Sequence, residues 1–565
     1  MELAGGQFDK RRSRGGGSVL PPVTRRDALA TLAATTAIGL AGCPAPSPPP
    51  LTGRFVPTQM ELGHRLRDGH SWNTTNIDWE SRHVVIVGGG IAGLSAARRL
   101  SQQGCDDYEI LELEDSAGGT SRAGQMSGLA HPWGAHYLPV PQSDQKELLE
   151  LLREMKVVES LDEHGSPQVA EEFLVREPQE RLFFRGAWQD ELDPLVDAPA
   201  EERAEWQRAL DEFQTWSDWR DAQGRAAFRL PLRLASTDPA VTQLDDISFA
   251  QWLDERRIRS PRVRWIAEYA CRDDYGTTLA QTSAWAGIFY FVSRLSDHQS
   301  GHQPLITWPA GNGAVVQHLA QLAGTRLKTN VAVVSLRSVS GANDQTDTGC
   351  ELIAVEPSSG RVRGLRARRV IWAAPRFVAA RVIQDEGFAS WSRWRDFQYG
   401  SWIVANLQLR DRPRETTFPL AWDNVLYDSP SLGYVTATHQ LGLDHGRTVW
   451  TYYFPLVGDD VVVERRELLE STWDEWVERI LGDLSLAHPD LRQLVERIDI
   501  LRWGHAMIRP RPGFLWSAAR REAARPWSAI HFAHTELSGL ALLEEAFDHG
   551  CRAADEVVMA LSRPR

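Results

Sequence analysis

An unbroken apolar run over residues 83–87 is the clearest sign of regular structure in the sequence. Its letters are His-Val-Val-Ile-Val, and no polar residue interrupts it after the histidine. A strand that is apolar at successive positions has both faces buried, as in a parallel sheet covered by helices. A glycine-rich turn over 88–93 and a helical stretch over 94–100 follow directly. This order predicts the strand, turn and helix that open a βαβ unit.

A second strand is expected over 108–111, and it ends at the acidic residue Glu112. The turn before it has the spacing Gly-x-Gly-x-x-Gly. In that spacing Gly88 permits the tight turn, Gly90 lets a pyrophosphate approach the backbone, and Gly93 lets the helix pack closely on the strand. A carboxylate at the end of the second strand can accept hydrogen bonds from a ribose diol. The pattern therefore predicts a dinucleotide-binding unit with the phosphates at the helix N-terminus.

Composition and charge narrow the class of protein. The 565 residues are 42% hydrophobic and 24% charged, with a formal net charge of −13. Nucleic acid is not expected as a partner, because phosphates require a basic face. The five cysteines are far apart, so the sequence has neither a CxxC redox pair nor a zinc-ligand cluster. No metal site is expected.

Residues 1–42 have the pattern of an export signal. An arginine pair, Arg25-Arg26, precedes an uncharged run over 28–42. That run is about 15 residues long, short of the ~20 that a membrane-spanning helix needs. A charged segment before a short apolar run is typical of a signal peptide. The adjacent arginines make this one resemble a twin-arginine signal, which predicts export by that route.

The end of the apolar run resembles a lipoprotein cleavage box. Leu-Ala-Gly precedes Cys43, and in such signals the cysteine becomes the lipidated first residue of the mature protein. The proline-rich residues that follow form a stiff, extended spacer. We therefore expect residues 43–80 to tether a periplasmic or cell-surface protein to a membrane through its lipid.

The sequence after Glu112 resembles the LE-x5-GGR signature of the flavin amine oxidase superfamily. Gly118 and Gly119 match its glycine pair, while Arg122 comes two residues later than the arginine of the signature. The superfamily includes monoamine and polyamine oxidases, L-amino-acid oxidases, protoporphyrinogen oxidase and phytoene desaturases. The resemblance implies FAD as the cofactor and a pairing of Arg122 with its pyrophosphate.

Further parts of the sequence resemble the same superfamily. Residues 132–137, Pro-Trp-Gly-Ala-His-Tyr, correspond to a turn against the flavin, and Val331 corresponds to a residue whose backbone meets adenine. A Phe-Ala-His-Thr-Glu stretch ends at Glu536, which the resemblance places near the ribityl–phosphate part. A final helix starting near Leu543 is implied to direct its dipole at the flavin, and its motif has Glu545 in place of a glycine. The residues expected to contact FAD are Gly88, Gly90, Ala92, Gly93, Glu112, Gly118, Gly119, Arg122, Gly134, Ala135, Val331, Glu536 and Leu543.

The resemblance also implies a domain organisation. We predict an α/β fold in which a discontinuous Rossmann-type FAD-binding domain is interrupted by an inserted α+β substrate domain. The insertion has helical Leu/Glu spacing in its first part and strand-like apolar runs in its second. The FAD-binding domain is expected over 82–137, 300–380 and 500–562, and the substrate domain over 138–299 and 381–499.

Flavin-dependent oxidation requires little acid–base chemistry from the protein. The protein mainly orients the substrate and excludes water from the pocket. Many amine oxidases of the superfamily keep a lysine that holds a water near flavin N5. Lys146, Lys156 and Lys328 fall outside the region that matches this lysine. Because this lysine is absent from the matching region, the sequence favours amine oxidation less than desaturase-like or dehydrogenase chemistry.

Three residues are the catalytic candidates. His136 and Tyr137 belong to the turn expected at the flavin. Trp503 is expected in a second turn, just before a Pro-Arg-Pro-Gly turn toward the other end of the chain. We expect the pocket to open between these turns and the helical insertion. The three charged residues at 272–274, Arg-Asp-Asp, have two interpretations. They form either a salt-bridged helix end or a polar part of the site.

The sequence favours an exported FAD-dependent oxidoreductase that oxidises an amine, amino acid or other small organic substrate by hydride transfer to flavin N5. The electrons would pass to oxygen or a quinone. The alternative is a non-catalytic flavoprotein, in which FAD is structural and the protein is a membrane-tethered binding partner. A third interpretation, an NAD-dependent dehydrogenase, gives no reason for the FAD-like motif near residue 536.

Overall fold

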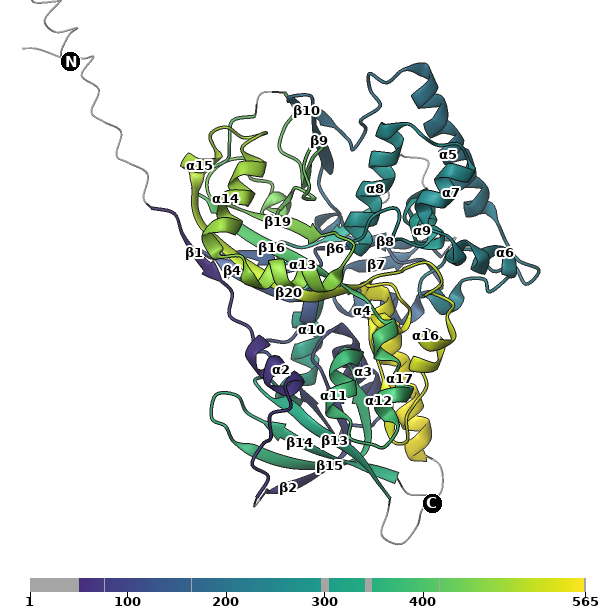
Figure 1. Cartoon of the computed structure of the whole chain (residues 1–565), viewed down its shortest axis with the longest axis vertical. Coiled ribbons are helices and arrows are strands. Elements are labelled where there is room, and N and C mark those ends of the chain that lie inside the picture. The colour runs from purple at the N-terminus through teal and green to yellow at the C-terminus, as the bar shows by residue number, and fades with distance from the viewer. Residues whose placement is uncertain are drawn as a thin grey trace, which may run out of the picture. The chain divides into compact units, whose positions relative to one another are not determined.

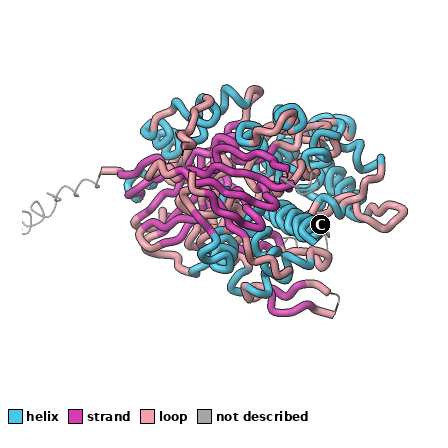
Figure 2. Tube along the Cα trace, turned by 90° about the horizontal axis from the view of Figure 1, so that it is seen from below, coloured by secondary structure: helices cyan, strands magenta, loops and turns pink. Residues whose placement is uncertain are grey.

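Two large β-sheets organise the part of the chain that begins at residue 51 (Figure 1). The structure is a computed structural model that describes residues 50–75, 77–163, 165–295, 304–340, 348–415 and 417–562. The predicted signal and the predicted lipidation residue, Cys43, lie outside these described residues. Helices flank the strands, as the view in Figure 2 shows.

The first sheet has seven strands and contains the predicted βαβ unit. Its strands run in the order β12 (Leu327–Lys328), β3 (Tyr108–Leu111), β2 (Trp79–Val87), β15 (Val362–Trp372), β14 (Thr348–Val355) and β13 (Ala332–Ser340), and β21 (Ile530–Phe532) also pairs with β15. β2 pairs in parallel with β3 on one side and with β15 on the other. Val84, Val85 and Ile86 are consequently fully buried. The strands predicted over 83–87 and 108–111 are confirmed.

Helices cover both faces of this sheet. One face packs against α3 (Ile91–Gln102), α10 (Gly313–Ala323) and α17 (Leu543–Ser562), which share a hydrophobic core with Val84 and Ile86. The other face packs with α11 (Arg376–Val382) in a core that contains Val85. The alternation of Val84, Val85 and Ile86 between two cores explains why the run contains no polar residue.

The second sheet has eight strands. Their order is β1 (Thr52–Phe55), β20 (Val495–Ile508), β16 (Tyr399–Leu409), β19 (Thr448–Leu456), β18 (Tyr434–Thr436), β17 (Asp423–Leu426), β9 (Glu180–Phe184) and β10 (Ala187–Asp190). α13 (Val461–Glu470) and α14 (Trp473–Leu484) pack on one face through Leu468 and Trp476. The opposite face presents aromatic residues such as Trp402 and Tyr453 to a cavity.

A helical insertion precedes most of the second sheet in sequence and has its own hydrophobic core. It contains α5 (Ala200–Asp218), α7 (Phe249–Glu255), α8 (Pro261–Tyr275) and α9 (Ala284–Leu295). The side chains of Ser248 and Ser260 cap α7 and α8 by accepting hydrogen bonds from backbone N–H groups of the first turn. Trp252 and Trp285 are fully buried, so these two tryptophans serve the core.

Two predictions along the chain differ from the structure. Within the expected 43–80 tether, residues form β1 and the helix α2 (Met60–Arg67). β1 pairs in parallel with β20, and Phe55 packs against the core of the second sheet, so this stretch belongs to the fold. β20 also crosses the expected boundary at residue 500. Trp503 therefore lies inside a strand rather than in a turn, because its register with Trp402 of β16 continues through it.

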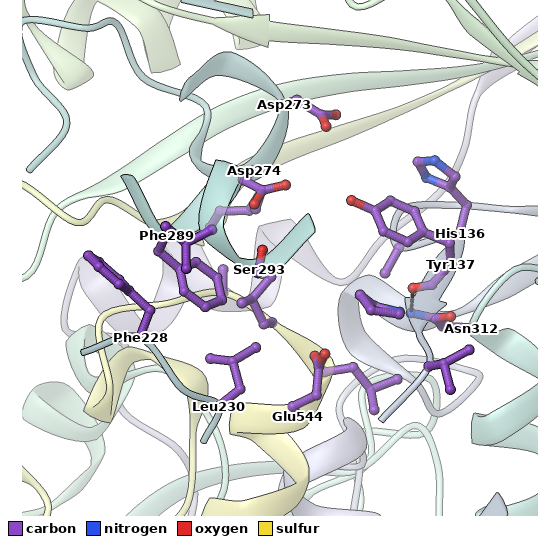
Figure 3. Close-up of a pocket in the computed structure, with 18 of the residues that line it drawn as sticks. His136, Tyr137, Phe228, Leu230, Asp273, Asp274, Phe289, Ser293, Asn312 and Glu544 are labelled. Atoms are coloured by element: carbon purple, nitrogen blue, oxygen red, sulfur yellow. Dashed lines mark hydrogen bonds between the residues drawn. The ribbon is translucent and has the colours of Figure 1, made fainter. Parts of the chain in front are cut away.

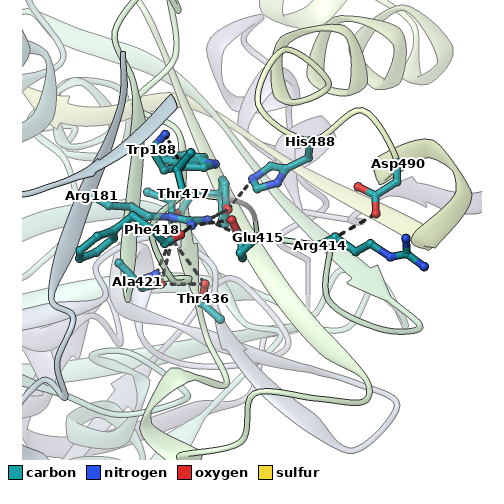
Figure 4. A network of polar contacts seen from close by, with 12 residues as sticks. Arg181, Trp188, Arg414, Glu415, Thr417, Phe418, Ala421, Thr436, His488 and Asp490 are labelled. Carbon is teal, nitrogen blue, oxygen red and sulfur yellow. Dashed lines mark hydrogen bonds and ion pairs between the residues drawn. The ribbon is translucent and has the colours of Figure 1, made fainter. Parts of the chain in front are cut away.

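The buried Arg181 joins distant parts of the second sheet (Figure 4). Its guanidinium, on β9, donates to the side-chain oxygen of Asn424 at 2.6 Å, to the carboxylate of Glu415 at 2.7 and 3.0 Å, and to the hydroxyl of Tyr434 at 3.1 Å. The ring of Trp188 stacks on it at 3.8 Å. Because Asn424 follows Asp423, this network fixes the start of β17, which lies at the cavity.

Candidate active site

The turn between β2 and α3 has the backbone geometry that a pyrophosphate requires. Gly88 has a φ of +108°, and a Cβ there would lie 2.6 Å from the carbonyl oxygen of Ala373. A Cβ on Gly93 would lie 1.9 Å from the carbonyl oxygen of Gly88, so only glycine lets α3 start this close to β2. Beside Gly90, in contrast, the Cβ position has open space around it. This space lies at the N-terminus of α3, whose first turn buries Ala92, and such helix ends favour phosphate oxygens.

Glu112 ends β3 beside this turn. Its carboxylate is buried and accepts hydrogen bonds from the N–H groups of Gly89 at 2.6 Å and Glu114 at 2.8 Å. Burial raises the pKa of this carboxyl. Each of its oxygens keeps a further lone pair that a ribose hydroxyl can use. Val331 donates its N–H to the carbonyl of Glu112 at 2.8 Å, so the residue expected at the adenine lies beside the one expected at the ribose.

Arg122 is the clearest sign that this surface is built for an anion. It follows the 3₁₀ turn Gly119–Ser121. Gly118, the residue before that turn, donates its N–H to the carbonyl of Gly89 at 2.9 Å. Nε and Nη2 of the buried guanidinium have no hydrogen-bond partner among the described residues, and Nη1 lies 3.8 Å from Glu114. Buried donors without acceptors are unfavourable, and a phosphate group supplies those acceptors. The 3₁₀ turn accommodates the two extra residues that precede this arginine in the sequence.

The turn expected at the flavin is held from two sides. A Cβ on Gly134 would lie 2.2 Å from the carbonyl oxygen of Thr120, and Ala135 donates its N–H to the same oxygen at 2.9 Å. The carbonyl of Gly134 accepts a hydrogen bond from the hydroxyl of Tyr453 at 2.8 Å. The carbonyl of Ala135 accepts one from the N–H of Asn312 at 3.1 Å. These contacts keep the turn beside the 3₁₀ turn that leads to the buried arginine.

The two C-terminal candidates lie on adjacent elements. The buried carboxylate of Glu536 accepts hydrogen bonds from the N–H of Arg376 at 3.2 Å and from the hydroxyl of Tyr399. Leu543 is the first residue of α17 and lines the cavity. The positive end of a 20-residue helix is therefore located at the cavity.

The residues of the first sheet fit an FAD molecule. A ribose acceptor on Glu112, open space at Gly90 and unsatisfied donors on Arg122 all come from one βαβ unit and the turn after it. That is the donor and acceptor set that an adenine dinucleotide requires. Across the described ranges, no group of His, Cys, Asp and Glu side chains gathers as a metal ion would need.

A cavity of about 330 Å³ opens between the turn at residue 134, the second sheet, the start of α17 and the helical insertion. His136, Tyr137 and Trp503 all line it, although they come from opposite ends of the chain. Figure 3 shows His136 and Tyr137 on one side and Phe228 and Phe289 on the other. The three catalytic candidates therefore share one space.

His136 lies within an aromatic group. Its ring centroid is 4.9 Å from that of Tyr453, 5.1 Å from that of Tyr137 and 5.3 Å from that of Trp422. Burial lowers the pKa of His136 to about 4, so the imidazole is neutral at pH 7. Aromatic rings on three sides exclude water and present a flat surface to a substrate.

Trp503 connects the cavity with the cofactor side. Its indole N–H donates to the carbonyl of Trp133 at 2.7 Å, and its ring lies 5.2 Å from the guanidinium of Arg122. On the neighbouring strand, the indole nitrogen of Trp402 has no hydrogen-bond partner among the described residues. Trp402 also lines the cavity.

Five carboxylates line the cavity: the exposed Asp218 at the end of α5, Asp273 and Asp274 in the last turn of α8, Asp423 at the start of β17 and Glu544 in α17. Burial and the charge of Asp273 raise the pKa of Asp423 well above its usual range. Burial and the charge of Asp274 raise the pKa of Glu544 to about 7. Burial, together with the charges of Asp423 and Asp273, raises the pKa of Tyr453, so these groups share one environment.

The structure distinguishes the two interpretations of residues 272–274. Asp273 and Asp274 line the cavity, whereas Arg272 donates to the carbonyl of Ser431 at 2.7 Å. No motif in the sequence indicated that Asp423, an isolated acidic residue at the start of a short strand, belongs to the site. Glu544 had a signal, since it precedes the residue that departs from the glycine of the family motif.

Lys146, Lys156 and Lys328 lie in or next to elements outside the cavity lining. Lys146 starts α4 (Lys146–Glu154), Lys156 follows that helix, and Lys328 is in β12. No lysine of the described ranges lines the cavity.

Known proteins resemble this chain along most of its length. A family model described as flavin containing amine oxidoreductase matches residues 91–558. The protein assigned as flavin-containing monoamine oxidase AofH of Mycobacterium tuberculosis is 25% identical over 298 residues, which are 50% of this chain and 59% of that protein. An L-amino acid dehydrogenase of Synechocystis is 23% identical over 492 residues, covering 80% of this chain and 89% of that protein.

Solved structures share the fold. A double mutant of putrescine oxidase superposes with a TM-score of 0.62 at 17% sequence identity, covering 85% of this chain and 100% of the other. Such a likeness shows a common fold, namely a Rossmann-type FAD-binding domain with a substrate domain. The chain spans about 59% of the length of the monoamine oxidase that it matches. Because the family model covers most of the chain, the protein belongs to the flavin-containing amine oxidoreductase family.

Proposed function

We propose that the protein oxidises a cationic amine, and the acidic lining of the cavity is the observation that carries this proposal. Asp273, Asp274, Asp423 and Glu544 surround a space bounded by aromatic rings. An ammonium group entering that space exchanges its water for carboxylates and ring faces, both of which favour a cation. When bound, FAD supplies a hydride acceptor for the carbon next to the nitrogen.

An amino acid fits this cavity less well than an amine. Its carboxylate needs a free guanidinium, and the lining arginines are already engaged. Arg229 pairs with Asp144 at 3.0 Å, and the exposed Arg220 donates to the carbonyls of Ser217 and Trp219. A substrate carboxylate would also face the acidic residues of the cavity, and like charges disfavour binding.

The protein residues can also manage the substrate's proton. An amine gives up a hydride only as the free base, because the nitrogen lone pair must stabilise the carbon that is left. Asp423 and Glu544 have raised pKa values, so the ionised form of either carboxylate is a stronger base than an ordinary one and can take the ammonium proton within the cavity. The aromatic group around His136 then holds the neutral amine and excludes water.

The first experiment is anaerobic bleaching of the FAD-loaded protein by a panel of primary amines, L-amino acids and alcohols of matched size. We expect amines to reduce the flavin and the other two classes to reduce it at least about tenfold more slowly, the discrimination expected when a buried charge is left unpaired. Faster reduction by L-amino acids would overturn the amine assignment. Reoxidation with oxygen and with a soluble quinone then identifies the electron acceptor.

A second experiment tests the acidic lining without turnover. A quaternary ammonium ligand keeps its charge at every pH, so its affinity reports the charge of the cavity. We expect binding to tighten as the pH rises through about 7, because Glu544 then ionises. Glu544→Gln should remove most of that rise, whereas the exposed control Asp428→Asn should keep it. A pH-independent affinity in the wild type would contradict the proposal.

The absence of a lysine from the described cavity lining favours one other function, a flavoprotein in which FAD is structural. The bleaching panel decides between them, since a structural flavin stays oxidised with every candidate. The aromatic and acidic cavity supports the catalytic proposal.

We further propose export by the twin-arginine route and a lipid anchor on Cys43. The support is the order of the arginine pair, the short apolar run, the Leu-Ala-Gly-Cys end and the proline-rich residues after it. Arg25→Lys with Arg26→Lys should keep the protein in the cytoplasm, and Cys43→Ser should release it from membranes. A wild-type protein that fractionates with the cytoplasm and keeps residues 1–42 would overturn this part.

A further inference from the structure

Glu545 is a buried carboxylate at the start of α17, in the position where the family motif has a glycine. It is 1% exposed and is absent from the lining of the cavity, although its neighbour Glu544 is part of it. One carboxylate oxygen accepts the N–H of Leu232 at 2.6 Å, and the other accepts the hydroxyl of Ser538. These hydrogen bonds, together with the more distant charges of Arg520 and Arg233, compensate its burial.

A chain of hydrogen bonds leads from Arg552 to Glu545, and each group in it donates to the next one. Arg552 can only donate, and its Nε lies 3.3 Å from Nδ1 of His549. The proton of the neutral imidazole is therefore on Nε2, which donates to the hydroxyl of Ser538 at 2.7 Å. Ser538 in turn donates to Glu545. The chain ends on the carboxylate, and a side chain without an acceptor at position 545 would leave the hydroxyl proton of Ser538 and the N–H of Leu232 without an acceptor.

The N–H that Glu545 holds belongs to one wall of the cavity. Phe228, Arg229 and Leu230 line the cavity, and residues 228–232, which we call the 228–232 wall, end at this N–H. Figure 3 shows Phe228 and Leu230 on the same side of the cavity, with Glu544 of α17 in the lower part of the view. Glu545 thus joins the 228–232 wall to the helix whose first residues form the floor of the cavity.

We propose that Glu545 is a specificity-determining positioning residue: it holds the 228–232 wall against the start of α17 and so sets the width of the cavity. The inference rests on the proposed amine oxidation for its consequence in substrate choice, but the contact itself does not depend on it. With the wall held, the cavity accepts slender amines and rejects branched ones. Without the carboxylate, the wall moves away and this discrimination falls.

The test compares Glu545→Ala with Glu545→Gln in the FAD-loaded protein. Glutamine keeps an oxygen for the N–H of Leu232, whereas alanine removes it. Hydrogen exchange at peptides covering 228–232 should accelerate about tenfold or more in the alanine variant and stay close to the wild type in the glutamine variant. The exposed Glu478→Ala of α14 is the matched control and should change nothing. Unchanged exchange in Glu545→Ala would overturn the proposal.

Substrate choice provides the second readout. For a linear and a branched amine of equal carbon number, we expect Glu545→Ala to reduce the ratio of their kcat/KM values about tenfold, mainly through KM. Maximal flavin reduction by the linear amine should change little, and Glu545→Gln should restore the ratio. An accelerated exchange with an unchanged ratio would show a structural contact only and overturn the specificity role. If Glu545→Ala does not load FAD, Glu545→Gln and Ser538→Ala carry the same two measurements, with the smaller effect expected for glutamine.

The two proposals fail in different ways. If no amine bleaches the wild-type flavin, the proposed function fails, and the specificity role fails with it. The exchange comparison then still decides whether Glu545 holds the wall. If amines bleach the flavin but the variants behave alike, the proposed function stands and only the role of Glu545 is wrong.

Discussion

The indole N–H of Trp503 donates a 2.7 Å hydrogen bond to the carbonyl of Trp133, and this bond joins β20 to the turn that precedes His136. The two residues are separated by 370 positions in the sequence. The same indole ring lies over Arg122, the buried guanidinium of the cofactor side. Trp503 therefore connects the cavity, the flavin-side turn and the cofactor site through one side chain.

Replacing Trp503 with phenylalanine should slow flavin reduction without releasing FAD. The ring remains, but the turn before His136 loses a hydrogen bond and its position becomes less defined. We expect a loss of about tenfold in the anaerobic reduction rate, since reactions of this kind depend on donor–acceptor placement. Trp473→Phe is the control, because its indole also donates to a carbonyl of β20, at 3.1 Å, but lies outside the cavity lining. Equal rates for both variants, or FAD loss in Trp503→Phe alone, would contradict the assignment.

Arg122→Met should weaken FAD binding while the apoprotein remains folded. The substitution keeps a long apolar stem but removes the donors that have no partner in the protein. We expect a loss of about 2–3 kcal/mol in FAD affinity, typical of a charged hydrogen bond to phosphate. Fluorescence titration of the apoprotein measures it. The control is Arg326→Met, whose guanidinium pairs with Asp106 at 2.9 Å near the surface. Equal affinity for the variant and the wild type would mean that another cation holds the pyrophosphate.

Glu544→Gln should stabilise the protein at neutral pH but not at low pH. The pKa of Glu544 is raised from 4.5 to about 7 in the folded state, so the fold favours its protonated form. The stability that this group contributes is present below about pH 4.5 and is lost as the pH rises through about 7. The variant should therefore gain on the order of 1–3 kcal/mol relative to the wild type between these pH values. Buried histidines such as His136 and His488 titrate with the opposite sign in part of this range, so the difference between the two proteins is the quantity to measure. A difference that is constant with pH would contradict the assignment.

Arg181→Lys should destabilise the fold strongly. Lysine cannot reach Asn424, Glu415 and Tyr434 at once, and it leaves the partly buried carboxylate of Glu415 with fewer donors. We expect a loss of about 2–4 kcal/mol in the free energy of unfolding. Arg185→Lys on the adjacent turn is the control, because that side chain is 58% exposed. Thermal or denaturant unfolding distinguishes them, and a loss below about 0.5 kcal/mol for Arg181→Lys would show that the network contributes little.

The parts of the fold that depend on local pattern were predictable from sequence. The run at 83–87 and the glycine spacing after it determine β2 and the start of α3, because both faces of the strand are buried and the turn tolerates only glycine. The cavity was predictable only in part. His136 and Trp503 belong to motif-bearing segments, whereas Asp423 reaches the cavity through the pairing of β17 with β9, a contact between distant segments.

The wrong predictions have related causes. Trp-Gly-His at 503–505 has the composition of a turn, but pairing with β16 extends the strand through it. Residues 52–67 follow a proline-rich stretch, and no local signal indicates that β1 adds to the edge of a sheet whose other strands come more than a hundred residues later. Both outcomes depend on a partner strand that local sequence does not reveal.

The position of β21 in the first sheet has a consequence for biosynthesis. β15 pairs with β2 along one edge, and on its other edge it receives β21, a strand at residues 530–532 that is followed by α17. A nascent chain on the ribosome therefore has the pyrophosphate-binding turn long before it has Glu536 or the helix that forms the floor of the cavity. Since multi-segment domains complete their folding only when the last segment is available, we expect FAD capture to wait until β21 and α17 have been synthesised. A chain truncated before β21 should be synthesised without bound FAD, and it should therefore be colourless and prone to aggregation.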